Sequence, residues 1–330
     1  MSSSSRFRDP LIGARLGEWE ILSRLGEGGM GVVYRCRGPG GAVAAAKVLH
    51  GEHSRVVEYV RRFRREADAA SRFSHPNAVG ILGSGVEGDL HYLLMEYAEG
   101  VDLETTIDER GGLPVLFVVD VGIQLAGALG AAHAAGIVHR DVMPSYVIVS
   151  ADGTVHLTDF GLARPMKAEA EDTRITRTDV VIGTPEYMSP EQCYGRTPDG
   201  RSDIYALGMM VYHALAGRHP FGDPRGRSLV SRLMRRQAEE VLPPVADLVA
   251  GVPGDLSRLV ERMLAKDPEG RPPDCGTVER ALESVRAGLL ARERSTVRRA
   301  LAGLRRAWRG GLDDPPPAFP DSGGGARSRR

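Results

Sequence analysis

One lysine in this chain of 330 residues lies where a charged side chain is unusual. Of its 43 lysines and arginines only three are lysine, namely Lys47, Lys167 and Lys266. Lys47 lies in the apolar run 44–49, which predicts a buried strand. A compact ammonium on a thin stem fits such a position, whereas a planar guanidinium does not. We therefore predict a functional role for Lys47, the alternative being chance survival in an arginine-rich chain.

A glycine-rich turn precedes this lysine. Residues 26–31 follow the pattern G-x-G-x-x-G, which alone also occurs in dinucleotide-binding folds. Those folds need a helix after the third glycine, but residues 32–36 are β-branched and aromatic and predict a strand. Because Gly26, Gly28 and Gly31 have no Cβ, backbone N–H groups beside them can approach phosphate oxygens. Strand, glycine turn and strand therefore predict a phosphate-binding flap.

The elements that must position these residues form a small β-rich part and a larger helical part. Short strands are predicted between residues 19 and 97, with one helix at 56–70, and helical patterns dominate residues 101–290. The longest of these patterns is 115–135, where Ala, Leu and Val prevail. A β lobe followed by a helical lobe predicts an α+β fold. Residues 1–18 are polar and predict a flexible lead.

The C-terminal residues 291–330 differ from the rest of the chain. They hold ten arginines against four acidic residues and end in proline and glycine runs typical of disorder. Val297, Leu301, Leu304 and Trp308 recur at helical spacing, so the sequence predicts a basic amphipathic helix within this tail. Such a helix could contact a protein partner or an acidic membrane surface. The alternative is a solvated helix whose apolar stripe packs on the helical lobe.

Composition argues against several classes of protein. With 43 basic and 43 acidic residues, the formal net charge of +0 gives no reason to expect nucleic acid as the main partner. Cys36, Cys193 and Cys275 are few and far apart, which indicates a reducing compartment rather than a disulfide framework. We expect no apolar run of about 18 residues and no signal peptide from this sequence. It therefore predicts a cytoplasmic protein.

Two motifs in the helical part carry a resemblance to a known family. Residues 139–149 are HRDVMPSYVIV, and the triplet DFG follows at 159–161. They resemble the catalytic loop and the metal-binding turn of protein kinases. The glycine turn and Lys47 precede them in the expected order. Residues 19–290 therefore resemble a eukaryotic-like bacterial Ser/Thr protein kinase with a degenerate catalytic loop.

The resemblance implies a two-lobed protein kinase fold whose N-lobe and C-lobe are the β-rich and helical parts defined above. It also implies transfer of the γ-phosphate of ATP to protein Ser and Thr hydroxyls with the help of Mg²⁺. In that role Lys47 would hold the α- and β-phosphates and pair with Glu66. Asp141 would be the catalytic base that orients the substrate hydroxyl, and Asp159 would bind Mg²⁺.

The resemblance also assigns the nucleotide contacts. Three glycines would approach the phosphates, four apolar residues would form walls around adenine, and two backbone positions would meet the edge of the base. These residues are Leu25, Gly26, Gly28, Gly31, Val33, Ala45, Glu96, Ala98 and Ile148. The four apolar residues could equally be ordinary core, and the sequence does not separate the two roles.

A regulatory role is implied for Arg140, which precedes the candidate base. In the family an arginine at this place binds a phosphothreonine that orders the activation loop. Thr176 and Thr178 are the candidate acceptors, and an active chain would phosphorylate them itself. The alternative is a solvated loop with incidental threonines.

Residues 183–191 resemble the substrate-docking end of the activation segment and are called the docking segment below. Thr184 is typical of Ser/Thr specificity. The resemblance pairs Glu191 with Arg271 in the C-lobe and lets Asp203 hold the backbone of the catalytic loop. A segment for docking proteins disfavours a further interpretation of the same fold, a phosphotransferase that acts on metabolites.

Two positions depart from the family pattern. Met143 stands where the family has a lysine that donates to the γ-phosphate, and a donor of this kind is worth about 10²–10³ in rate. Tyr146 stands where the family has an asparagine that binds a second Mg²⁺ and hydrogen-bonds Asp141. A neutral phenol is a poor ligand for Mg²⁺. The sequence is therefore consistent with a slow kinase or with a nucleotide-gated pseudokinase that serves as a scaffold.

Overall fold

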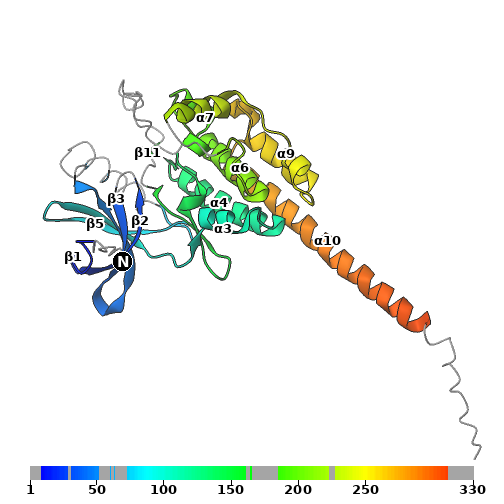
Figure 1. The fold of residues 1–330 in the computed structure, drawn as a ribbon, viewed down its shortest axis with the longest axis horizontal. Helices are drawn as coiled ribbons and strands as arrows, with labels where there is room; N and C mark the ends of the chain where they lie inside the picture. The colour runs from blue at the N-terminus through cyan, green and yellow to red at the C-terminus, as the bar shows by residue number, and fades with distance from the viewer. Residues whose placement is uncertain are drawn as a thin grey trace, which may run out of the picture. The chain divides into compact units, whose positions relative to one another are not determined.

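The computed structural model divides the chain into two compact units, Met1–Arg286 and Ala287–Arg330. It describes residues 9–28, 31–51, 60, 63, 73–160, 164–165, 185–222 and 227–310. The first unit contains a β-rich lobe followed in sequence by a helical lobe (Figure 1). The predicted α+β class is therefore confirmed.

A six-stranded antiparallel sheet forms the β-rich lobe. Its strand order is β1-β2-β3-β4-β6-β5, so β5 lies outside β6 at one edge. The strands are β1 (Arg15–Leu16), β2 (Trp19–Gly28), β3 (Gly31–Arg37), β4 (Val43–Leu49), β5 (Ile81–Glu87) and β6 (Leu90–Glu96). The strands predicted on both sides of the glycine turn are the β2–β3 hairpin, in which Gly28 pairs with Gly31.

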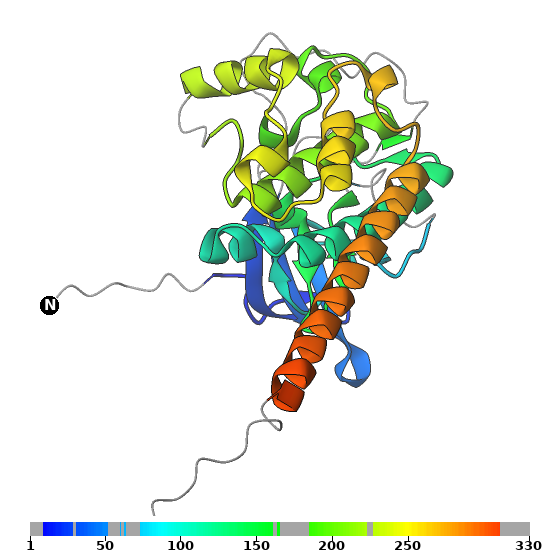
Figure 2. The same ribbon diagram turned by 90° about the vertical axis from the view of Figure 1, so that its right-hand side faces the viewer.

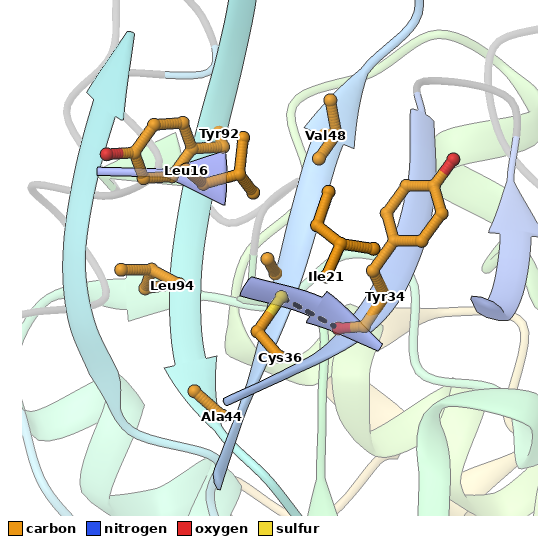
Figure 3. Close-up of a cluster of buried hydrophobic side chains, with 9 residues drawn as sticks. Leu16, Ile21, Tyr34, Cys36, Ala44, Val48, Tyr92 and Leu94 are labelled. Atoms are coloured by element: carbon orange, nitrogen blue, oxygen red, sulfur yellow. Dashed lines mark hydrogen bonds between the residues drawn. The ribbon is translucent and has the colours of Figure 1, made fainter. Parts of the chain in front are cut away.

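Alternation along β4 decides which way Lys47 points. Ala44 and Val48 belong to one buried apolar cluster, together with side chains from β1, β2, β3 and β6 (Figure 3). Ala45 and Leu49 belong to a second cluster on the other face of the sheet. Because successive side chains of a strand alternate between its faces, Lys47 shares the second face. The buried strand predicted around Lys47 is confirmed.

The helical lobe is built around α4 and α6. Its helices are α3 (Leu103–Arg110), α4 (Val115–Ala134), α5 (Pro190–Cys193), α6 (Gly200–Ala216), α7 (Arg227–Glu239), α8 (Val245–Leu248), α9 (Gly254–Met263) and α10 (Cys275–Gly310), which continues into the second unit. Every residue of α6 from Ser202 to Leu215 is buried. In Figure 1, and again in Figure 2 after a quarter turn, the sheet and the helices α7 and α9 lie on opposite sides of α4.

Short strand pairs hold the segment that follows α4. The pairs join β9 (Val147–Val149) to β7 (Val101–Asp102) and to β10 (Val155–Leu157), and β8 (Ile137–Val138) to β11 (Arg164–Pro165). The catalytic-loop motif begins directly after β8 and ends with β9, and Asp159 follows β10. Pairing of β9 with β10 therefore brings the two motifs close together, although the sequence separates them.

Helix α4 is apolar on nearly all sides. By length and composition it is the one helix among the described residues that could cross a membrane, and 50% of its most apolar window is buried inside the protein. This finding corrects the expectation that no apolar run of this length exists. A helix that is apolar all round belongs in a membrane or in the core of a large lobe, and packing against α6, β8 and β10 accounts for α4.

Helix α10 runs unbroken from Cys275 to Gly310. A helical backbone is thus present where the sequence predicts a basic helix, but no change in secondary structure marks the boundary predicted at residue 290. The described residues do not include 1–8, 311–330, most of the predicted helix 56–70, or the side chains beyond 295. The flexible lead predicted for residues 1–18 is wrong for its second half, because β1 (Arg15–Leu16) pairs with β2 and Leu16 is 0% exposed in the core of the sheet. For residues 1–8 it stays a prediction, as do the disordered end and the contacts of the tail.

Candidate active site

Lys47 and Asp159 form an ion pair between the β-rich lobe and the helical lobe. Nζ of Lys47 lies 2.5 Å from Oδ1 of Asp159, although 112 positions separate the two residues in the chain. Both side chains are largely buried, with 11% and 20% of their surface exposed. Burial of an isolated charge is costly, so a buried ammonium needs an anion beside it. Asp159 provides that anion for the lysine in the apolar strand β4.

Backbone strain is concentrated beside the candidate base Asp141. Among the described residues, the non-glycine residues with positive φ are Arg140 at 71° and Asp159 at 61°. L-residues rarely adopt this left-handed conformation, and it persists where the surrounding structure imposes it. One strained residue directly precedes Asp141, and the other is the partner of Lys47. Strain of this kind is typical of functional sites.

Asp203, at the start of α6, holds the beginning of the catalytic loop. Its two carboxylate oxygens accept the backbone N–H groups of His139 at 2.9 Å and of Arg140 at 2.7 Å. The role predicted for Asp203 is therefore confirmed. Burial alone would raise the pKa of this carboxyl group, but hydrogen bonds from His133 and from the Arg140 N–H hold the pKa below its ordinary value. The loop thus rests on a buried carboxylate.

Tyr146 occupies the space beside the candidate base. Its side chain is half-buried and lies close to the carboxylates of Asp159 and Asp141, the latter only 8% exposed. Burial, followed by the negative charges of Asp159 and Asp141, raises the pKa of the Tyr146 phenol far above its ordinary value. The phenol therefore stays protonated beside the Asp141 carboxylate.

Met143 contributes neither charge nor a side-chain hydrogen-bond donor to the loop. Its side chain is buried, and its carbonyl accepts the N–H of Tyr146 at 3.0 Å in the 3₁₀ turn Pro144–Tyr146. The Tyr146 carbonyl in turn accepts the N–H of Thr158 at 2.8 Å. These bonds tie the catalytic loop to the residue that precedes Asp159. The backbone of the loop is fully supported although its side chains depart from the family pattern.

Aromatic packing also supports the turn that carries Asp159. The ring of Phe160 is 3% exposed and meets His139 edge to face, with ring centroids 4.8 Å apart. The Nε2 of His139 lies 3.1 Å from the carbonyl oxygen of Thr158, to which it must donate. The first residue of the catalytic loop is therefore fixed against the residues on both sides of Asp159.

The residues predicted to contact adenine differ in burial. Ala45 belongs to the buried cluster on the Lys47 face of the sheet, and Val33 packs against that cluster. Leu25 is 46% exposed, which does not fit an ordinary core position. Ile148 and Ala98 are half-buried. The structure thus separates Leu25 from the core, which the sequence alone does not do.

One position predicted to meet the base already uses a backbone group. The N–H of Glu96 donates to the carbonyl of Gly80 at 2.9 Å, and its carboxylate accepts the Gly80 N–H at 3.1 Å. Any hydrogen bond from the backbone of Glu96 to a ligand would therefore use its carbonyl oxygen. This finding narrows the prediction made from the sequence for this residue.

The absence of a side chain has a different structural cause at Gly31 than at Gly26 and Gly28. A Cβ at Gly31 would lie 2.2 Å from the carbonyl oxygen of Val48, so close strand packing excludes a side chain there. A Cβ at Gly26 or Gly28 would meet nothing within 4 Å. Gly31 is therefore required by the sheet, while the space beside Gly26 and Gly28 is open to a ligand.

A buried ion pair anchors the docking segment. Both Arg271 terminal nitrogens lie 2.8 Å from the Glu191 carboxylate oxygens, and the two residues are 3% and 7% exposed. The predicted pair is confirmed. Burial would raise the pKa of Glu191, but hydrogen bonds from Arg271 and Ser202 hold the pKa below its ordinary value. Glu191 thereby joins the docking segment to Ser202 at the start of α6 and to Arg271 in the C-lobe.

Two supporting residues escape sequence reasoning. His133 places its Nε2 2.7 Å from the Asp203 carboxylate, and Gln192 donates to the carbonyl of Arg140 at 2.8 Å. One feature of the sequence could have identified His133, namely its imidazole near the end of the apolar helix α4, six residues before His139. Gln192 gives no comparable signal, because a glutamine in a short helix is ordinary.

Some predicted residues lie outside the described part of the chain. They are Glu66, Gly161, Thr176, Thr178 and the first two residues of the docking segment. The pair between Lys47 and Glu66 and the phosphorylation of the activation loop therefore stay predictions.

Comparison with known proteins assigns the chain to a family. Residues 19–284 match the model of the protein kinase domain, which covers both lobes and every motif described above. The chain belongs to the protein kinase family. This match confirms the two-lobed protein kinase fold predicted from the sequence.

The relatives of this protein kinase include curated bacterial enzymes. It is 38% identical over 283 residues to the serine/threonine-protein kinase Pkn1 of Myxococcus xanthus, covering 84% of this chain and 39% of Pkn1. It is 37% identical over 260 residues to the serine/threonine-protein kinase PrkC of Bacillus subtilis, covering 78% of this chain and 39% of PrkC. The chain thus spans about two fifths of the length of each relative. The predicted resemblance to eukaryotic-like bacterial Ser/Thr kinases is confirmed.

A solved structure agrees with this assignment. The kinase domain of PknI from Mycobacterium tuberculosis superposes with a TM-score of 0.63 at 28% identity, covering 83% of this chain and 98% of that domain. The likeness therefore extends over both lobes of the protein kinase fold.

Protein kinases use ATP and Mg²⁺, and the donors of this kinase fit one metal ion. Mg²⁺ is usually held by one or two carboxylates together with substrate phosphates. Asp159 offers a carboxylate of this kind. The second position of the family pattern holds the neutral phenol of Tyr146, which lies beside Asp141. Among the described residues, no group of three or more His, Cys, Asp or Glu forms a metal site of its own.

Proposed function

We propose that the chain is a Ser/Thr protein kinase that transfers the γ-phosphate of ATP to protein hydroxyls at a reduced rate. The observation that carries this proposal is the convergence of Lys47 and Asp159 near Asp141. Together the three side chains supply a cation for phosphate, a carboxylate for a metal and a base for a hydroxyl. A chain that only kept the fold would not need these three chemical types in one place.

Each of the three side chains has one task in this proposal. Lys47 holds the α- and β-phosphates, and Asp159 gives a carboxylate to Mg²⁺, which when bound neutralises phosphate charge. Asp141 orients the substrate hydroxyl and accepts its proton. The protonated phenol of Tyr146 lies beside Asp141 and would donate to its carboxylate. Lys47 and Asp159 pair with each other when no nucleotide separates them.

Adenine would lie between the lobes in this proposal. The exposed leucine Leu25 and the half-buried Val33 and Ile148 support apolar walls on both sides of the base. The open space beside Gly26 and Gly28 supports phosphate binding below the flap. Glu96 and Ala98 would contribute backbone groups to the edge of the base.

The reduced rate follows from Met143. Transfer moves charge onto the γ-phosphate, and a donor aimed at that charge is worth about 10²–10³ in rate. The buried thioether of Met143 donates no hydrogen bond. Transfer without this donor is slow, but the tasks of Lys47, Asp141 and Asp159 do not depend on it.

A protein is the proposed acceptor, because the docking segment is firmly anchored by Glu191 and Arg271. We also propose that the chain phosphorylates Thr176 and Thr178 in its own activation loop, with Arg140 as the receptor of the phosphate. The three cysteines are free, which supports a location in the reducing cytoplasm. Contact of the basic tail with a partner or an acidic membrane surface is a further part of the proposal.

Met143 and Tyr146 favour one second candidate, a pseudokinase that binds ATP and acts as a nucleotide-gated scaffold. In that case the Lys47–Asp159 pair would open to accept nucleotide and close without it. The two candidates share nucleotide binding and differ in transfer. They are therefore separated by an experiment that measures both quantities on the same sample.

The test combines thermal unfolding with phosphate transfer. ATP with Mg²⁺ should raise the melting temperature of the chain, and ³²P from labelled ATP should enter a generic basic protein slowly. The matched variant Asp141→Asn should keep the thermal shift and lose the transfer, because it removes the base and little else. A shift without transfer in the parent would favour the scaffold, and no shift at millimolar ATP would overturn both candidates.

Autophosphorylation has its own test. After incubation with ATP, phosphopeptide mapping should find label at Thr176 or Thr178. Label found only outside residues 159–191 would contradict the proposed role of Arg140.

A further inference from the structure

Two histidines lie directly beneath the docking segment. Tyr187, in the 3₁₀ turn Pro185–Tyr187, places its hydroxyl 2.7 Å from Nδ1 of His213 on α6. The carbonyl of Glu186 lies 2.9 Å from Nε2 of His219, which follows α6. The two imidazole rings meet at nearly a right angle, with centroids 5.6 Å apart. We refer to His213 and His219 as the histidine pair.

The partners of His219 determine its protonation. The backbone N–H of Phe221 donates to Nδ1 at 3.3 Å, so Nδ1 must carry a lone pair. The carbonyl of Glu186 can only accept, so Nε2 must carry the proton. His219 can therefore make both bonds only as the neutral tautomer with its proton on Nε2. A second proton on the ring would face the Phe221 N–H and break that bond.

A buried glutamine completes the hold on the segment. The amide of Gln237, on α7, also donates to the Glu186 carbonyl, and Gln237 is 0% exposed. Its side-chain oxygen accepts the Tyr205 hydroxyl at 2.8 Å, which fixes the amide orientation. The Glu186 carbonyl thus receives two donors from two different elements. Tyr187 is 5% exposed, so both the backbone and the side chain of this turn are bound from below.

We propose that the histidine pair positions the docking segment for the protein substrate, with His219 acting through its neutral form. The inference rests on the proposed function, because it assigns substrate docking to this segment. His213 and His219 are positioning residues and touch neither nucleotide nor the transferred phosphate. Loss of either one weakens docking of the protein acceptor and leaves ATP binding unchanged. Loss of the neutral form has the same effect, so docking weakens in acid.

The direction of the pH effect follows from the charges around the pair. Burial lowers the pKa of His219, the Glu186 and Gly222 carbonyls raise it, and the positive charge of Arg236 lowers it, leaving it below 6.5. Burial, and then His219, lower the pKa of His213 to about 4. The other charges near this turn are the carboxylates around Tyr187, namely Glu104, Glu186 and Asp108.

The pair's contribution is therefore fully present above the unfolded pKa of 6.5. It is lost as the pH falls through the lower folded values. Docking of the protein acceptor should therefore weaken as the pH falls. Protonation of His213 and His219 should leave ATP binding unchanged.

The test compares His219→Leu with His219→Gln. Leucine removes both hydrogen bonds, whereas the glutamine amide keeps a donor for the Glu186 carbonyl. Hydrogen exchange over residues 185–193 should rise about threefold to tenfold in His219→Leu and return toward the parent value in His219→Gln. The KM for a generic basic acceptor protein should rise by a similar factor in His219→Leu, with the KM for ATP unchanged. In the parent the acceptor KM should also rise from pH 7 to pH 5.

The test has a control variant and outcomes that would contradict the inference. His91→Leu removes a histidine from β6 in the other lobe and should change neither exchange in the docking segment nor the acceptor KM. The inference would be overturned if hydrogen exchange over the docking segment were unchanged in His219→Leu. It would also be overturned if exchange in this variant rose evenly over α6 and α7. A parent without transfer would overturn the proposed function instead, and the exchange measurement would still decide whether His219 holds the segment.

Discussion

The two ends of the catalytic loop follow different rules. At its start, the backbone of His139 and Arg140 is held by the buried carboxylate of Asp203. At its end, Met143 and Tyr146 replace the side chains that act on phosphate and metal in the family. The first end has the contact that the resemblance assigns to Asp203, and the second end departs from the family pattern in two side chains. The support of the loop and the chemistry of the loop are therefore separable.

The difference has a physical cause. Asp203 is 0% exposed and compensates buried N–H groups, so its removal leaves polar groups without partners in the core. At positions 143 and 146 the loop is held by backbone hydrogen bonds, so replacement of these two side chains leaves that support in place. The phenol of Tyr146 stays beside Asp141, where the family has the asparagine. A chain can thus keep the fold while its rate of transfer changes.

The largest effect is expected at the supporting end. Asp203→Ala should lower the free energy of unfolding by about 3–5 kcal/mol, because it removes one partner from a buried charged network. Urea denaturation with linear extrapolation measures this loss. Asp152→Ala, which removes an exposed carboxylate in the turn before β10, is the matched control. A loss below about 1 kcal/mol in Asp203→Ala would show that the loop does not depend on this support.

The next largest effect is expected at positions 143 and 146. Here the substitutions should raise the rate of transfer rather than lower stability. Met143→Lys supplies a donor for the γ-phosphate, and Tyr146→Asn supplies a ligand for a second metal ion. Each should raise transfer by roughly tenfold to a thousandfold, and the two gains should not simply add. Turnover and nucleotide Kd are measured for both variants and the double variant. A double variant no faster than the parent would place the defect elsewhere.

A third prediction concerns the ion pair between the lobes. A ligand at a hundredfold excess over its Kd stabilises the native state by about 2.7 kcal/mol. Lys47→Ala should reduce this stabilisation by ATP and Mg²⁺, because it removes the cation that faces the phosphates. Thermal unfolding with and without nucleotide gives the result. Lys266→Ala controls for the loss of a lysine, and equal nucleotide shifts in parent and Lys47→Ala would contradict the role of Lys47.

The smallest effect separates the two tasks of position 146. Tyr146→Phe removes the phenol O–H that lies beside Asp141. If this O–H positions the base, its loss costs about 0.5–1.5 kcal/mol and should slow transfer about twofold to tenfold. Turnover of Tyr146→Phe beside the parent measures this effect. An unchanged rate would mean that the phenol does not position Asp141.

The sequence predicts the local elements well because they depend on neighbouring residues. Apolar and β-branched runs identify β3 and β4, and the strand after the third glycine separates a kinase flap from a dinucleotide fold. The sequence does not distinguish Gly31 from Gly26, although only a Cβ at Gly31 would collide with another strand. That difference depends on the approach of β4, which no local pattern contains.

Residue types and their order alone therefore determined the family, the two lobes, and the positions of Lys47, Asp141 and Asp159. The partner of each side chain was decided by tertiary structure. Lys47 meets Asp159 across 112 positions, and the loop around Tyr146 is tied to Thr158 after β10 by a backbone hydrogen bond. Such contacts arise from packing between elements distant in the chain, and a list of residue types does not specify which of the possible neighbours a side chain will reach.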